Sequence, residues 1–427
     1  MKKLLTLTAL GTILMAADAM AAGFHLREQS AAAQGNAFAG ATAGAENNSY
    51  AYFNVAGLTR HKGTQGNAGV TYIAPRAEAS DVKDDTGKDQ LDIDNIVHAA
   101  WAPNGTISHQ LNDKWTVGLS LNVPFGMITK YDGRWVGSDH GNLSKVVTVT
   151  TTPMAAYKVN DKLSVGAGLP IQYVKAKLSN SAVLATTPGL LTADDVHLKG
   201  DTVDVGYQLG AMYEFNENAR IGVGYRSEIN HKLKGDIKSQ DAADIGGIIP
   251  GGLLNQDISA KLDTPAMFSV GGFYQLNEKW AVMAEYQRVF WSSFESLDIV
   301  GDSVNKPAGN ISSTKENWRD TNFYALGASY QLDHQWKARF GVAFDQAAVT
   351  ISDRTPRIPD SDRVWFSGGL NYEYSDKLSF DLAYTYIKAK KATVNTRLTE
   401  NTGSSRDFSA RYSNSVKLFG LSMNYKF

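Results

Sequence analysis

The chain has no cysteine, no long apolar segment beyond its N-terminal residues, and no excess of charge of either sign. Without cysteine, neither a disulfide framework nor a thiolate metal site can form. After residue 20, no apolar run approaches the ~20 residues that a membrane-spanning helix needs. The 42 lysines and arginines balance 43 aspartates and glutamates, so the net charge of -1 gives no reason to expect a nucleic-acid partner.

The N-terminus has the three parts of an export signal. Lys2 and Lys3 are positively charged, residues 4–15 are largely apolar, and Ala19-Met20-Ala21 fits the small-x-small cleavage pattern. A short membrane anchor is the alternative, but the apolar stretch is too short to span a bilayer. We therefore expect residues 1–21 to be a signal peptide that is removed, so that the exported chain begins at Ala22.

A short polar turn between bulky apolar residues recurs six times. The copies begin at Leu111, Val159, Phe215, Leu276, Leu332 and Tyr374. Five share one five-residue frame, whereas the third reaches its apolar partner only through Arg220 and Ile221. Asn, Asp and Ser close tight turns because their side chains bond nearby backbone groups. The repeats predict six antiparallel hairpins that all turn on the same side.

Apolar and polar residues alternate on both sides of these turns. Trp115, Val117 and Leu119, for example, alternate with Thr, Gly and Ser, which places them on one face of a strand. A soluble sandwich also alternates, but these strands are about ten residues long, the tilted length that crosses a bilayer. Charges and glycines occupy the other face, and aromatic residues lie near the turns, as in membrane barrels.

The number of strands follows from the turns. Six turns define twelve strands, and one strand at each end raises the number to fourteen, an even number as in bacterial barrels. The first strands are expected near Gly66–Pro75 and Asp92–Trp101, and the third begins at Trp115. We predict an all-β fold: a 14-stranded antiparallel transmembrane β-barrel over residues 66–427, with its short turns in the periplasm.

Some segments do not follow the barrel pattern. Residues 22–65 are rich in Ala, Gly, Asn and Ser and do not alternate. We interpret them as a hatch that plugs the lumen; a disordered periplasmic arm is the alternative. Two outer connections are apolar where loops are normally polar, which indicates a groove for apolar ligands or a lid made by the two loops. Their apolar residues are Leu190, Leu191, Ile248, Ile249, Leu253 and Leu254.

Several motifs together resemble the FadL/TodX family of outer-membrane transporters of long-chain fatty acids and other hydrophobic compounds. They are Ala22-Gly23-Phe24-His25-Leu26, Phe53-Asn54-Val55-Ala56-Gly57-Leu58, Pro124-Phe125-Gly126, Tyr225-Arg226-Ser227-Glu228 with Lys234-Gly235, and Ile358-Pro359-Asp360-Ser361-Asp362-Arg363-Val364-Trp365. The resemblance covers nearly the whole exported chain. It implies capture of a hydrophobic molecule in outer loops, transfer to a lumen pocket, and sideways exit at a kinked third strand.

The resemblance also implies roles for individual residues. Phe53 and Asn54-Val55-Ala56 correspond to the hatch motif, although the family has Asn-Pro-Ala there. Because proline fixes φ and valine does not, the hatch turn is expected to be softer or differently shaped. The wall opening corresponds to Pro124, Gly126 and Gly133; proline and glycine are also the residues that interrupt a strand.

The resemblance further implies a basic residue that meets a fatty-acid carboxylate. The matching positions are Lys315 and Lys175, with Arg319 as a nearby alternative. A charged partner suits a carboxylate that leaves water, but solvated lysines are the commoner case. Lys175 also shares the register of outward-facing Tyr173, which counts against an inward site unless a bulge intervenes.

Four functions can be compared on these grounds. Passive uptake of hydrophobic molecules across the bacterial outer membrane fits the apolar loops and the plug. A general porin would need an open lumen, and a surface receptor or adhesin remains the other alternative. An enzyme is not expected, because the eight histidines fall in no recognisable catalytic frame and no metal or cofactor motif is present. We expect a monomer in the lipid bilayer, inserted by the barrel-assembly machinery that recognises a terminal Phe427.

Overall fold

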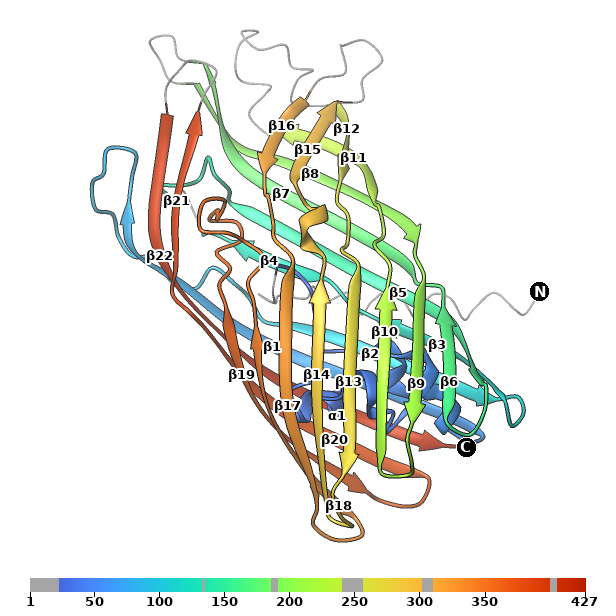
Figure 1. Ribbon diagram of the computed structural model, residues 1–427. Helices are drawn as coiled ribbons and strands as arrows, with labels where there is room; N and C mark the ends of the chain where they lie inside the picture. Colours follow the sequence, from blue (N-terminus) through green and yellow to red (C-terminus); the bar gives the residue numbers. More distant parts are fainter. Residues whose placement is uncertain (1–22, 133–134, 186–190, 240–255, 302–309, 400–404) are drawn as a thin grey trace, which may run out of the picture.

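The strands of the computed structural model form one antiparallel sheet that closes on itself (Figure 1). The structure describes residues 23–427 apart from 133–134, 186–190, 240–255, 302–309 and 400–404. Closure is direct, because the first strand, β1 (Thr64–Lys83), pairs with the last, β22 (Ser405–Lys426), from Gln65 opposite Lys426 upward. The predicted signal peptide lies outside the described residues.

The barrel has fourteen strands, as the turns predict, but only six are continuous. The other continuous strands are β2 (Ala100–Gln110), β5 (Leu143–Lys158), β18 (Trp336–Asp345) and β19 (Arg363–Glu373). Eight strands consist of two segments each: β3 (Trp115–Asn122) and β4 (Gly126–Lys130), β6 (Leu163–Gly168) and β7 (Ile171–Ala185), β8 (Leu191–Val205) and β9 (Gln208–Glu214), β10 (Ala219–Arg226) and β11 (Lys232–Ser239), β12 (Gln256–Lys261) and β13 (Met267–Gln275), β14 (Trp280–Val289) and β15 (Ser296–Gly301), β16 (Asn310–Lys315) and β17 (Thr321–Gln331), and β20 (Leu378–Ala389) and β21 (Ala392–Thr399).

The six short turns have the predicted chemistry. In the first, Asn112 Oδ1 accepts the N–H groups of Lys114 and Trp115 at 2.9 and 3.0 Å. The same position does this in every other turn, through Asn160, Asn216, Asn277, Asp333 and Ser375. The third turn keeps the common frame, although the next bulky apolar residue after it is Ile221. Phe215 N–H donates to the Ala219 carbonyl at 2.9 Å, so backbone bonding keeps the common frame without a bulky apolar residue at its end.

Two further expectations about the first strands need correction. The second strand is Ala100–Gln110 rather than 92–101, and β1 extends well beyond Pro75 to Lys83. The upper part of β1 carries outward charges such as Arg76 instead of apolar residues, so the apolar alternation ended before the strand did. Outward residues at membrane level are apolar and exposed, for example Leu326 and Leu382, whereas Asp381 on the inner face is buried.

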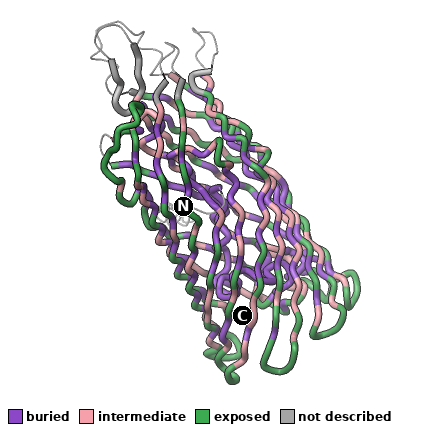
Figure 2. Tube along the Cα trace, turned by 60° about the vertical axis from the view of Figure 1, so that its left-hand side comes forward, coloured by how far each residue is buried: buried purple, intermediate pink, exposed green. Residues whose placement is uncertain are grey.

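The N-terminal segment lies inside the barrel. It contains α1 (Ala31–Gly35), α2 (Ala41–Gly44) and two 3-10 turns, η1 (Asn48–Tyr52) and η2 (Val55–Arg60), drawn in blue between the lower strands in Figure 1. α1 contacts β19 and β20, α2 contacts β10 and β13, and η2 contacts β5 and β6. Nearly all of its residues are buried (Figure 2), which is consistent with the predicted plug.

A glycine on the barrel wall permits this close packing. A Cβ at Gly341 would lie 2.1 Å from the carbonyl carbon of Asn36, so any other residue would push α1 away from β18. Among the described residues, no helix has the length and apolar character needed to cross a membrane.

Candidate binding site and wall opening

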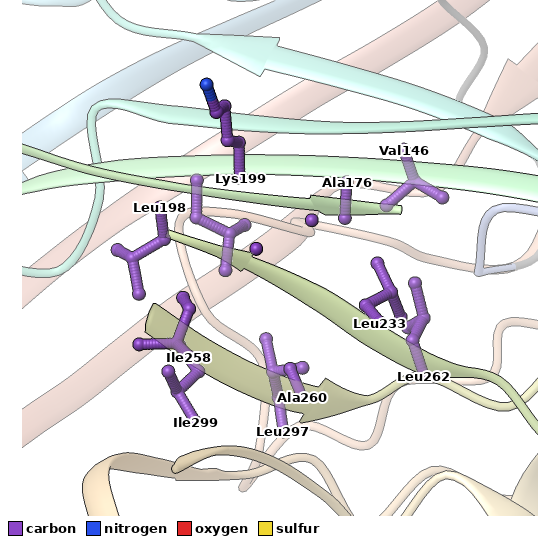
Figure 3. Close-up of a pocket in the computed structure, with 13 residues that line it drawn as sticks. Val146, Ala176, Leu198, Lys199, Leu233, Ile258, Ala260, Leu262, Leu297 and Ile299 are labelled. Atoms are coloured by element: carbon purple, nitrogen blue, oxygen red, sulfur yellow. The ribbon is translucent and has the colours of Figure 1, made fainter. Parts of the chain in front are cut away.

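An apolar pocket lies against the inner face of the upper wall (Figure 3). Its empty space, about 500 Å³, includes a part open to solvent. It is lined by Val146, Ala176, Leu178, Leu198, Lys199, Gly200, Leu233, Gly235, Ile258, Ala260, Leu262, Leu297 and Ile299. Lys199 is the one charged residue in this set, and its ammonium points away from the apolar side chains. Such a pocket suits an apolar molecule, because contact with these side chains removes apolar surface from water.

The pocket continues into an aromatic cluster around Phe24, in the N-terminal segment. The Phe24 ring lies 4.8 Å from Trp291 and 5.7 Å from Trp318, measured between centroids, and 5.8 Å from Phe125. Val146, Leu233 and Leu262 belong both to this cluster and to the pocket lining. The apolar surface is therefore continuous from the pocket to Phe125.

Phe125 marks an interruption in the third strand, where the sequence predicts it. β3 ends at Asn122 and β4 begins at Gly126, with Pro124 between them. Pairing of β2 with β3 ends at Gly105 opposite Leu121. Among the described residues, β4 forms strand pairs with β5 alone, so residues 100–104 of β2 have no strand partner on this side. The wall is therefore parted between β2 and β4.

The N-terminal segment occupies the inner side of this opening. Leu26 N–H donates to the Pro124 carbonyl at 2.8 Å, and Gly126 N–H donates to the Phe24 carbonyl at 2.9 Å, which sets His25 opposite Phe125. The side-chain amide of Gln29 adds three hydrogen bonds to the end of β3 and the residue after it. Its Nε2 donates to the Val123 carbonyl at 2.8 Å, and its Oε1 accepts from Val123 N–H at 3.1 Å and from Asn122 Nδ2 at 3.2 Å.

The start of this segment is also tied to the outer connection that precedes β19. Gly23 N–H donates to Asp360 Oδ2 at 3.1 Å, and the same oxygen accepts from Ala348 N–H at 3.3 Å. Arg363 lies 3.3 Å from the other carboxylate oxygen. Burial raises the pKa of Asp360, and Arg363 opposes that shift. One carboxylate thus joins the N-terminal segment to the outer connection.

The hatch motif lies deeper, against β5, β6 and β9. Asn54 Oδ1 caps η2 by accepting Ala56 N–H at 3.0 Å, while its Nδ2 donates to the carbonyls of Thr42 and of Ala211 in β9, at 2.8 and 2.9 Å. Val55 is fully buried at the first position of η2. Valine thus stands where a helical turn has an N–H without an intrahelical partner, which is the position that tolerates proline.

The three predicted carboxylate partners do not meet at the apolar site. Lys175 and Lys315 project from the outer face of the wall, each beside an inward neighbour, Val174 or Thr314. Arg319 is half exposed and lies 3.6 Å from Asp362. Residue parity along the strand places the lysines outside, as the register of Lys175 with Tyr173 suggested.

Sequence reasoning missed the cation that does lie beside the cluster. Arg357 Nη1 donates to the Leu143 carbonyl and to Ser144 Oγ, both at 2.9 Å, and the next residue, Ile358, belongs to the cluster. Burial lowers the pKa of Arg357 to about 10, so it stays charged at neutral pH. The sequence did offer one sign of this residue, because Arg357 directly precedes the family-like motif at residues 358–365.

Most residues of the predicted outer groove lie outside the described residues. They are Leu190, Ile248, Ile249, Leu253 and Leu254; Leu191 begins β8, but its side chain is not described. Gly133, predicted at the wall opening, also lies outside the described residues.

Comparison with known proteins places these features in context. The family described as outer membrane protein transport protein (OMPP1/FadL/TodX) matches residues 12–427. A long-chain fatty acid transport protein of Escherichia coli O6:H1 is 30% identical, over 98% of this chain and 97% of its own length. Outer membrane protein P1 of Haemophilus influenzae is 30% identical over 99% of both chains. The crystal structure of a Pseudomonas aeruginosa FadL homologue superposes with a TM-score of 0.85 at 26% identity, covering 95% of this chain and 99% of that one.

Proposed function

Because the chain belongs to the OMPP1/FadL/TodX family of outer membrane transport proteins, we propose that it carries long-chain fatty acids or other hydrophobic molecules across the outer membrane by passive diffusion. Its relatives include proteins named for long-chain fatty acid transport. The observation that carries the proposal is the continuous apolar surface from the upper pocket to the parted wall, with the Phe24 segment at its inner end. A general porin is disfavoured, because the N-terminal segment fills the lumen that a porin would need open.

The route has three steps. A hydrophobic molecule first enters the upper pocket from the outer loops. It then competes with Phe24 for the aromatic cluster, which requires the Gly23–Asp360 bond and the backbone bonds at Pro124 and Gly126 to break. Once the segment has moved, the molecule leaves between β2 and β4 into the lipid. The Asn54 contacts hold the rest of the hatch against the wall meanwhile.

Arg357 is the carboxylate partner that suits an acid ligand best. It is buried beside Ile358, and its guanidinium is held by the Leu143 carbonyl and Ser144 Oγ. A charged guanidinium recognises a carboxylate through paired hydrogen bonds. Lys175, Lys315 and Arg319 would reach such a carboxylate only if the wall rearranged, since their side chains are exposed.

Uptake by cells tests the proposal. A strain without this protein and its paralogues should take up labelled long-chain fatty acid and toluene slowly, and the reintroduced gene should restore uptake of at least one. If neither compound enters faster with the protein than without it, the proposal is wrong. Heat-dependent gel mobility of the expressed protein serves as the folding control.

A further inference from the structure

The outer surface of the upper wall carries a belt of lysines directly behind the apolar pocket. Members of this lysine belt alternate with inward apolar residues along their strands, as Lys177 and Lys199 do with Leu178 and Leu198. The belt consists of Lys145 on β5, Lys175 and Lys177 on β7, Lys199 on β8, Lys232, Lys234 and Lys238 on β11, Lys261 on β12 and Lys315 on β16. Two of these are the residues that the sequence singled out for a carboxylate.

Like charges stand directly opposite one another in this belt. Lys145 pairs with Lys177, and Lys177 pairs with Lys199, so three ammonium groups form a row across β5, β7 and β8. Opposed residues in an antiparallel pair are only about 5 Å apart, and like charges at such positions are destabilising. Asp236 lies 3.2 Å from Lys199 and 3.4 Å from Lys238, so one carboxylate is shared by two lysines. Lys177 has a lysine opposite it on each neighbouring strand, so an external anion beside Lys177 would relieve repulsion.

Acidic residues partly balance the belt. Asp201 stands directly opposite both Lys175 and Lys234, and Asp263 lies 2.8 Å from Lys261. On the outer face of β5, β7, β8 and β11 the described lysines still outnumber the aspartates.

The depth of the belt indicates which anion it meets. Along β7 the outward residues run from Ile171, which is exposed, through Tyr173 to Lys175 and Lys177. Apolar residues followed by tyrosine mark the edge of the lipid core and its interface. The six short turns lie at the other end of the strands, so this interface is that of the outer leaflet.

We propose that the lysine belt binds the phosphate groups of a phosphorylated glycolipid in the outer leaflet, with Lys177 and Lys199 as its centre. Lysine is a strong point-charge partner for phosphate, and basic clusters at the membrane surface attract anionic headgroups. The apolar surface directly below, including Ile171 and Val203, takes up the acyl chains, which free phosphate lacks. The proposal needs only the outer-membrane location and does not depend on what the barrel transports.

Native mass spectrometry of the full-length protein in detergent can test this by titration with bis-phosphorylated lipid A. The double variant K177Q/K199Q should bind about 25-fold more weakly than the parent, from about fivefold for each lysine removed. Lys162 and Lys279 lie in periplasmic turns, so K162Q/K279Q is the matched control and should bind as the parent does. K177R/K199R keeps the charges and should retain binding.

Several results would overturn the proposal. Equal lipid A binding by K177Q/K199Q and by the control would show that the row is a solvated surface. Equal binding of dephosphorylated and bis-phosphorylated lipid by the parent would remove the role of phosphate, and displacement by millimolar inorganic phosphate would point to a free anion site. A heat-dependent gel shift in each variant establishes that the barrel is folded.

Discussion

A disulfide between residues 25 and 125 should lock the N-terminal segment onto the parted wall. His25 and Phe125 lie directly opposite each other, and the two backbone bonds of Leu26 and Gly126 flank them. This is a non-hydrogen-bonded antiparallel pair, whose Cα atoms are about 4.5 Å apart, within the range that a disulfide spans. Because the chain has no cysteine, the variant H25C/F125C would contain a single thiol pair.

The size of the effect follows from the bonds that hold the segment. Two backbone bonds and three bonds of the Gln29 amide join it to residues 122–126. The bond between Gly23 and Asp360 is a sixth. At about 1 kcal/mol net each, the six bonds stabilise the closed arrangement by about 6 kcal/mol, so only about one molecule in 25,000 is open without ligand. A ligand gains about 0.8 kcal/mol for each buried methylene, so about eight methylenes offset the bonds. Long chains should open the wall and chains of about four carbons should not.

Uptake of labelled fatty acid by cells is the assay, with oxidised and reduced protein compared in the same strain. The oxidised double variant should transport no faster than a strain without the protein, and a reductant should restore transport. The single variants H25C and F125C control for loss of each ring. Full transport by a quantitatively oxidised protein would refute the reasoning, because the segment would then not need to leave the opening.

Three other changes test separate contacts. Arg357→Gln should slow uptake of fatty acid by about tenfold or more while leaving toluene uptake unchanged, and Lys315→Gln should affect neither; equal loss for both ligands would contradict a role in carboxylate pairing. Val55→Pro should stabilise the folded protein by up to about 1 kcal/mol and so raise its thermal midpoint. The reason is that Asn54 already has the extended backbone that precedes proline, with φ -152° and ψ 108°. A lower midpoint would show that the hatch turn differs from η2 as described. Burial raises the pKa of Glu316 to about 7 from 4.5, so the folded state holds its proton longer and loses stability as pH rises between these values. Glu316→Gln should abolish that loss, roughly 3 kcal/mol, in a series of thermal midpoints from pH 4 to 8; a parental pH dependence in the variant would contradict it.

The sequence predicts best what local chemistry determines. Each hairpin turn is closed by one Asn, Asp or Ser and two neighbouring N–H groups, so six turns and fourteen strands follow from short segments. The interruption at Pro124 is similarly local. In contrast, the contact between Gly23 and Asp360 joins residues 337 positions apart, and no periodicity encodes such a pairing.

The buried Arg357 shows what the sequence does not predict. Lys175 and Lys315 were chosen by motif position, yet strand parity places both on the outer wall. Arg357 lies in the irregular segment before β19, where no periodicity assigns a face. Its burial results from how that segment folds against Leu143 and Ser144, which is a property of the closed barrel.

The reversal of polarity between the two halves of the wall supports the proposed sideways exit. On β10 the outward residues include Ile221 and Val223, and the inward Arg220 is buried; on β11, beyond the interruption, Lys232 and Lys234 face outward and Leu233 faces inward. The upper lumen is therefore apolar and the lower lumen polar. Below the pocket, Arg339 is paired with Asp381 at 2.9 Å inside the barrel. An apolar chain moving straight down would lose about 0.8 kcal/mol for each methylene that left apolar contact for this charged interior, whereas the lipid beyond β2 and β4 keeps it in apolar surroundings. Replacing Arg339 and Asp381 together by Leu should therefore leave the exit route unchanged, since the plug still fills the lower lumen, while the disulfide at residues 25 and 125 should still block it. Continued fatty-acid uptake by the oxidised protein with both sets of changes would show that the lower lumen, and not the wall, is the path.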